Sequence, residues 1–295
     1  MNHAGRKGDA LSPQELKLIA DAAQYLEHPS LLMQLANVVG KPLEMVLKAV
    51  DKVAPGRVDD AVSAALRTAL NVAVRTIPAG TQSDAISVVG DVNEIGSTPS
   101  FLHKLSVALT GSVGGLFGVA GLALELPITT TIMFRSITSI AKEHGEDVGH
   151  AEVQLQCLTV FCLGGPGTGD DALDSAYLAA RFGLQEMVTH ATRAVAGLTA
   201  AELAASIQRG AAPAVVSLIA KIAARFNVTV SQKVLVQSIP VLGAATGATI
   251  NVAFMDHFNR VARFHFGIRS LERKHGIDVV QAAYRDAVLR AKNVA

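Results

Sequence analysis

A short cluster of histidine and acidic residues could bind a metal ion. Two histidines and three acids fall within nine positions: His144, Glu146, Asp147, His150 and Glu152. Imidazole and carboxylate groups are common ligands of zinc, so this cluster would be the place for a zinc or di-metal centre. The HExxH motif of zinc hydrolases is absent, however. A helix that ends near Gly145, followed by a helix with an acidic first turn, explains the same residues without a metal.

A second acidic cluster follows a glycine-rich loop at residues 163–169. Asp170, Asp171 and Asp174 match the short DDxxD pattern that holds magnesium in enzymes of isoprenoid diphosphates. Positions three or four apart share a helix face, so these carboxylates could share a cation. In the structural alternative, Asp170 caps a helix and the other two acids complement its positive end. The loop lacks the Lys-Ser/Thr ending of a P-loop, which argues against nucleotide hydrolysis.

The sequence offers no credible nucleophile. The Gly-x-Ser-x-Gly motif is absent. Cys157 and Cys162 lie five positions apart on a predicted helix, too far around it to be bridged by a disulfide. Apolar surroundings should raise the pKa of both thiols and leave them inert. We therefore assign no catalytic residue and expect no cofactor.

Glu125 is the one charge in an apolar run between Lys104 and Arg135. A buried carboxylate without a partner is costly, so Glu125 must be paired, protonated or solvent-facing. The favoured structural account is a buried pair between helices with an arginine, for which Arg135 and Arg181 are candidates. The functional alternative places Glu125 at the head of a lipid-lined groove.

Composition and hydrophobic spacing predict an all-α fold. Of the 295 residues, 50% are hydrophobic and only 4% are aromatic, with a mean hydropathy of +0.35. Apolar residues recur at helical spacing from a capping box at Ser12 and Glu15 onward, and no stretch alternates like a strand. We predict a multi-helix bundle with long glycine-rich apolar central helices, comprising a helical extension at 1–54 and a main domain at 55–295. The net charge of +1 gives no argument for nucleic-acid binding.

Two apolar runs, residues 105–134 and 234–255, are long enough to cross a bilayer. A lipid-exposed Glu125 or Asn251 within them would be costly, so we expect both runs to be buried in a soluble bundle. That bundle would line an apolar groove and touch a membrane reversibly. Each run carries paired glycines that favour close helix contact: Gly114 with Gly118, and Gly243 with Gly247.

Residues 140–148 and 271–279 echo each other, because each contains His-Gly followed by an acid and a valine. In both, His-Gly predicts a helix C-terminus with glycine in the left-handed cap position. The echo fits either a true internal repeat or two independent caps.

Several of these motifs together resemble the EcsC protein family over roughly residues 55–285. The resemblance rests on the stretch 121–137, the two His-Gly segments, the acidic motif ending at Arg181, and residues 239–258. The family's name comes from a gene beside those of an ABC transporter, which implies a membrane-linked context and a transporter as a candidate partner. It implies no catalytic roles. The ligand or groove candidates are family-pattern positions, namely Glu125, Arg135, Tyr177, Arg181 and Asn251.

Three functional hypotheses follow. The first is a non-enzymatic helical protein that binds lipid or another hydrophobic ligand, or associates with a membrane. The second is a metal-dependent hydrolase that uses the acids at 146–152 and 170–174. The third is a soluble adaptor whose apolar runs are buried core. The first seventeen residues contain no apolar signal core, so we expect a cytoplasmic protein, peripheral at the inner face of a bacterial cell membrane.

Overall fold

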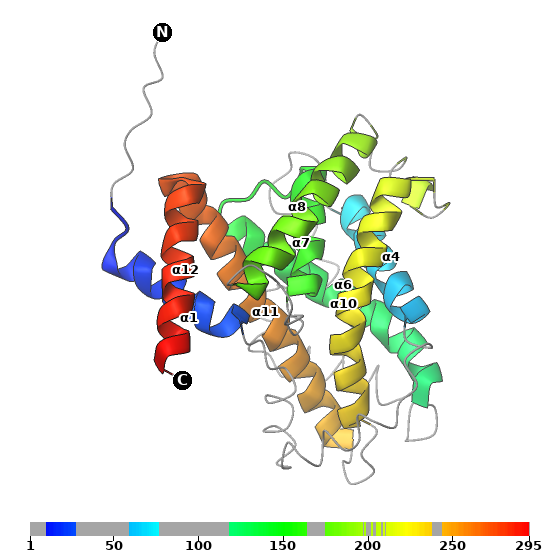
Figure 1. Cartoon of the computed structure of the whole chain (residues 1–295). Helices are drawn as coiled ribbons and strands as arrows, with labels where there is room; N and C mark the ends of the chain where they lie inside the picture. Colours follow the sequence, from blue (N-terminus) through cyan, green and yellow to red (C-terminus); the bar gives the residue numbers. More distant parts are fainter. Residues whose placement is uncertain are drawn as a thin grey trace.

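The computed structural model describes residues 10–27, 59–76, 118–163, 175–196, 211–237 and 244–294, with a few positions between 198 and 209. Its helices pack into a bundle (Figure 1): α1 (Pro13–Glu27), α4 (Asp59–Thr76), α6 (Gly118–Glu143), α7 (Ala151–Leu163), α8 (Ala176–Val195), α10 (Pro213–Gln237), α11 (Ala244–His275) and α12 (Ile277–Val294). These described ranges contain no strand. The predicted all-α bundle is confirmed. The predicted glycine-rich character of its central helices is not shown, because Gly114 and Gly243 lie outside the described residues.

The long helix α11 connects the parts of the bundle, and its contacts set the direction of its neighbours. Ser136 on α6 donates a hydrogen bond to Asn259 on α11 (2.8 Å). Ten residues farther along both segments, Glu146 pairs with Arg269 (2.8 Å). The two segments therefore run in the same direction.

Helix α10 runs antiparallel to α11, as two ring contacts show. The rings of Phe226 and Phe258 lie 5.4 Å apart, and the Lys233 ammonium lies 5.0 Å from the ring centre of Phe254. From Phe226 to Lys233 the chain moves toward the end of α10, while the contacted residue on α11 moves toward its start, from Phe258 to Phe254. The start of α6, the end of α10 and the start of α11 consequently lie at one end of the bundle, which we call the apolar end; it is the lower part of the view in Figure 1.

Local helix signals were predicted correctly at three ends. Glu15 and Ser12 exchange the two hydrogen bonds of a capping box, 2.8 and 3.3 Å long. Gly145 and Gly276 follow the ends of α6 and α11 with φ of 81° and 95°, as left-handed caps require. Helix α4 covers Asp59–Thr76.

The predicted start of the helix after the glycine-rich loop is wrong. Helix α8 begins at Ala176, and its N-cap is Ser175, whose side chain accepts a hydrogen bond from the Leu178 amide (3.1 Å). Glu27 of α1 also bonds the Ser175 hydroxyl and the Ala176 amide, at 2.5 and 2.8 Å. A contact between distant segments therefore fixes this helix start. The expected Asp170 cap does not belong to α8.

The apolar runs are divided among helices. Of the second run, residues 234–237 lie in α10 and residues 244–255 lie in α11; of the first run, the residues from Gly118 onward lie in α6. By length and composition alone, one segment of the described chain could cross a membrane: Pro213–Lys233 on α10, with a hydropathy of 1.4. In the bundle, 44% of its most apolar window is buried.

Candidate functional site

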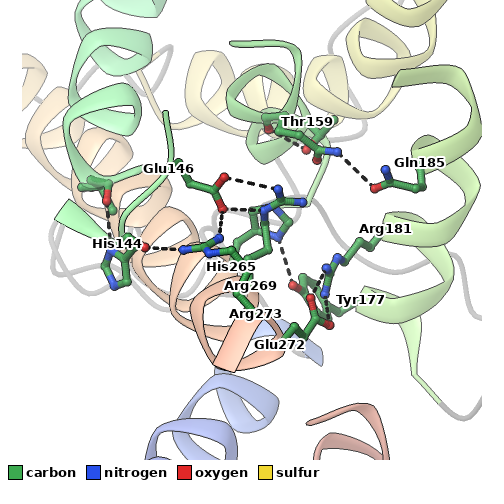
Figure 2. A network of polar contacts seen from close by, with 12 residues as sticks. His144, Glu146, Thr159, Tyr177, Arg181, Gln185, His265, Arg269, Glu272 and Arg273 are labelled. Atoms are coloured by element: carbon green, nitrogen blue, oxygen red, sulfur yellow. Dashed lines mark hydrogen bonds and ion pairs between the residues drawn. The ribbon is translucent and has the colours of Figure 1, made fainter. Parts of the chain in front are cut away.

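A buried polar network joins α8 to α11 (Figure 2). The Arg181 guanidinium donates to both carboxylate oxygens of Glu272, at 2.8 and 2.5 Å, and both side chains are at most 10% exposed. One turn before Arg181, the Tyr177 hydroxyl lies 3.0 Å from Nδ1 of His265. Two of the sequence candidates, Tyr177 and Arg181, thus lie together, with partners that the sequence analysis missed.

A second ion cluster lies at the turn after α6. Glu146 is buried and accepts from Arg269 Nε (2.8 Å) and from Arg273. Arg273 also donates to the His144 carbonyl, so it clamps the His-Gly turn on both sides of Gly145 (Figure 2). This arrangement holds the end of α6 against the last turns of α11.

The other metal candidates of this region do not converge on Glu146. His144 bonds the Ile140 carbonyl through Nδ1 (2.9 Å), while Asp147 and His150 pair with each other at the surface (3.2 Å). Glu152 is exposed on α7. In the part of the chain that the structure describes, no three His, Cys, Asp or Glu side chains are grouped to hold a metal ion. Asp170, Asp171 and Asp174 lie outside that part, and their role stays a prediction.

Several buried titratable groups in and near the network have pKa values that are shifted away from neutral pH. Burial lowers the pKa of His265 well below 6.5, and the nearby Arg181 and Arg269 lower it further, so the imidazole is neutral. Burial raises the pKa of Tyr177 to about 12 and that of Cys157 to about 12. Cys162 is likewise a free, buried thiol whose pKa burial raises, as expected from its apolar surroundings. An efficient general acid or base needs a pKa near the operating pH, which none of these groups has.

Because Glu146 is paired with arginines, we expect the free energy of unfolding to depend on pH in the acid range. Burial alone would raise the pKa of Glu146, but Arg269 and Arg273 hold it below 4.5. A carboxylate with a lowered folded pKa stabilises the fold above its unfolded pKa, and the stabilisation is lost as pH falls through the folded value. We expect the unfolding free-energy gap between wild type and Glu146→Gln to be full near about pH 7 and to shrink below about pH 4. Urea titrations across that range measure it; a gap that stays constant down to about pH 2 would contradict the pairing.

A third group of polar residues lies buried toward the apolar end. Asn251 on α11 is 5% exposed, and its Oδ1 makes no hydrogen bond within the part of the chain that the structure describes. The same holds for the hydroxyls of three threonines: Thr129 and Thr130 on α6, and Thr229 on α10. A buried polar atom without a partner costs about 1–3 kcal/mol, so these atoms need an explanation. Lys233, one turn after Thr229, is also fully buried.

Of this group, only Asn251 was a candidate from the sequence. Lys233 carried a signal of the kind used for Glu125, because it is the one charge between Arg225 and Asp256. Glu125 itself lies on α6, but its side chain is outside the described residues. Arg135 is half-buried on the same helix. Arg181 pairs with Glu272, and the expected pair of Glu125 with an arginine stays a prediction.

Comparison with known proteins gives one match. The model of the EcsC protein family matches residues 31–271, which is most of the chain. The match includes both polar networks up to Leu271 and the apolar end of the bundle, and it leaves out α1 and α12. No curated protein and no solved structure matches the chain.

Proposed function

The chain belongs to the EcsC protein family, and since this membership alone gives no activity, we propose that it is a non-enzymatic protein that attaches reversibly to a membrane surface. The apolar end of the bundle is the surface that would make the contact. The proposal places the protein at the inner face of the cell membrane, with a membrane transporter as a candidate partner.

The observation that carries the proposal is the uneven distribution of charge over the bundle. At the apolar end, Glu125 is the only charge in the first seventeen residues of α6, and residues 244–255 of α11 contain none. Ile128 on α6 and Val252 on α11 lie about two helical turns before the contact of Ser136 with Asn259, toward the apolar end. They are 50% and 40% exposed. Exposed apolar side chains with few charges beside them are typical of membrane or partner contacts.

Among the described residues, most of the ion pairs lie toward the opposite end of the bundle. Glu15 on α1 binds Lys274 (2.8 Å) and His275 (3.0 Å), close to the Glu146 cluster on the same end of α11. Exposed apolar residues on α12, such as Leu289, have charged neighbours including Arg290. This end therefore suits water, and the bundle has the polarity of a protein that rests on a membrane by one end.

The cavity that the described residues enclose is small, which supports a surface contact more than a large internal ligand site. A cavity between α4, α7, α8 and α10 has about 10 Å³ of space, enough for about one water molecule. Its lining is mostly apolar: Leu70, Ala151, Gln154, Leu155, Val195 and Val215.

The test compares two exposed apolar residues, one at the apolar end and one on α12. Ile128→Glu places a charge on the apolar end, and Leu289→Glu places the same charge on α12, where the side chain is 47% exposed against 50% for Ile128. We expect Ile128→Glu to reduce flotation with anionic phospholipid vesicles at least about tenfold, because a charge at a bilayer contact costs more than about 1.4 kcal/mol. Leu289→Glu should float like wild type. Equal behaviour of the two variants would contradict the assignment of the contact surface.

A further inference from the structure

The apolar end of the bundle brings no basic residue from the two apolar runs to which its helices belong. Residues 105–134 and 234–255 contain no lysine or arginine, and their one charge is the acid Glu125. We infer that the protein recognises a membrane surface by its loosely packed acyl chains, and not by the negative charge of its head groups. This inference rests on the proposed membrane attachment and names the kind of lipid surface that the apolar end would bind.

Lys233, which directly precedes the second run, does not supply the missing positive charge. Its side chain is fully buried, and its ammonium lies 5.0 Å from the ring centre of Phe254, inside the bundle. A basic residue strengthens binding to an anionic membrane only when it lies near the surface, by about fivefold for each residue. An acid such as Glu125 gives no attraction to anionic lipid. The charges of the two runs and of Lys233 therefore give no preference for anionic head groups.

The charged residues that follow the contact residues toward the opposite end of the bundle limit the depth of insertion. On α11, Val252 is four residues before Asp256 and eight before Arg260, and these two half-exposed side chains pair with each other. On α6, Ile128 is seven residues before the half-buried Arg135. These separations are about 6–12 Å along the helix axes. The contact is therefore shallow, and its depth is close to the roughly 5–10 Å at which interfacial helices lie.

Shallow contact through aliphatic side chains depends on access to the acyl chains of the lipid. Ile128 and Val252 are exposed aliphatic residues, which gain free energy only where they leave water for hydrocarbon. Their neighbours are uncharged as well, since Thr129 follows Ile128 and Asn251 precedes Val252. In a tightly packed bilayer the head groups cover the hydrocarbon, whereas high curvature exposes it. Binding through apolar area alone is accordingly sensitive to curvature and lipid packing.

Flotation of wild type with four types of vesicle tests the inference. The vesicles are small or large, and consist of neutral phosphatidylcholine alone or mixed with anionic phosphatidylglycerol, with the same acyl chains throughout. We expect small neutral vesicles to float at least about fivefold more protein than large neutral vesicles at equal lipid concentration. Anionic lipid or high salt should change flotation less than about twofold, because the described residues of the contact include no exposed basic group.

The outcomes separate this inference from the proposed function. Flotation that requires anionic lipid, or that high salt abolishes, would overturn the inference and leave the membrane attachment standing. Equal flotation with small and large neutral vesicles would do the same. Absence of flotation with all four vesicle types would contradict the attachment itself.

Substitutions of two exposed valines connect the behaviour to the apolar end. Val252→Lys and Val252→Glu both place a charge at the contact, so both should float with small neutral vesicles at least about tenfold less than wild type. On small anionic vesicles, Val252→Lys should float at least about fivefold more than Val252→Glu, because only the lysine is attracted to the lipid. Thermal unfolding of each variant checks that the charge leaves the fold intact.

Val279 on α12 provides the matched control, since it is 47% exposed against 40% for Val252. Val279→Lys and Val279→Glu should float like wild type with neutral and with anionic vesicles. Equal flotation of the two Val252 variants on anionic vesicles would place Val252 away from the lipid surface and overturn the inference.

Discussion

Glu146→Gln is expected to lower the free energy of unfolding by about 3 kcal/mol, one of the two largest effects of any single substitution proposed for this chain. The carboxylate is buried and is the counter-charge of Arg269, whose side chain is only 18% exposed. Loss of the charge leaves that guanidinium buried and unpaired, which is more costly than the pair itself is stabilising. The estimate is at the low end of the usual range because Arg273 is 42% exposed and recovers contact with water. Urea denaturation followed by circular dichroism measures the loss.

A matched substitution at an exposed pair provides the control. Asp256 pairs with Arg260 one turn away on α11 (3.0 Å), and both side chains are about half exposed. Asp256→Asn should cost no more than about 0.5 kcal/mol, because water already solvates both charges. Similar small losses for Glu146→Gln and Asp256→Asn would show that the Glu146 cluster is not a buried ion pair in solution.

The second large effect is expected at the pair of Arg181 and Glu272. Arg181→Met should destabilise the protein by about 3–5 kcal/mol, since Glu272 would keep a buried charge without its two guanidinium bonds. Glu272→Leu should cost a similar amount for the converse reason. The double variant is expected to be more stable than either single variant, because two apolar side chains of similar size leave no unpaired charge.

A double-mutant cycle of chemical unfolding measures this coupling. The account requires that the two single losses add up to far more than the loss of the double variant. Additive losses would mean that Arg181 and Glu272 act independently, and that their bidentate contact does not hold α8 to α11.

The features predicted from sequence were mostly those that depend on neighbouring residues. The capping box at Ser12 and the left-handed caps at Gly145 and Gly276 are fixed by residues within one helix turn, so their patterns could be read directly. The inert cysteines followed from an apolar segment around Cys157, and that segment is buried on α7.

Features that depend on the packing of distant helices were not predictable in the same way. Tyr177 and Arg181 were named as candidates, but the partner of Arg181 lies 91 residues farther along the chain. The arginine that binds Glu146 through its Nε lies 123 residues farther along. A local sequence pattern cannot identify which arginine pairs with an acid, or which acid with an arginine, at such separations. The pairing depends on how α11 packs against α6 and α8.

The start of α8 shows the same limit at a helix end. Acidic residues at 170–174 are good helix-start residues by local propensity. The structure instead starts the helix at Ala176, where Glu27 of α1 bonds the Ala176 amide and the hydroxyl of its cap. The Glu27 carboxylate of α1 thus accepts the hydrogen bonds at the start of α8, a role that was expected of the local acids.

The central claim is that this bundle rests reversibly on a membrane by its apolar end. Flotation of the purified, detergent-free protein with anionic phospholipid vesicles tests that claim most directly. The account predicts that the protein floats with the vesicles and returns to the soluble fraction after an alkaline carbonate wash. Protein that remains at the bottom of the gradient with every vesicle composition, or that resists the carbonate wash as an integral protein does, would contradict it.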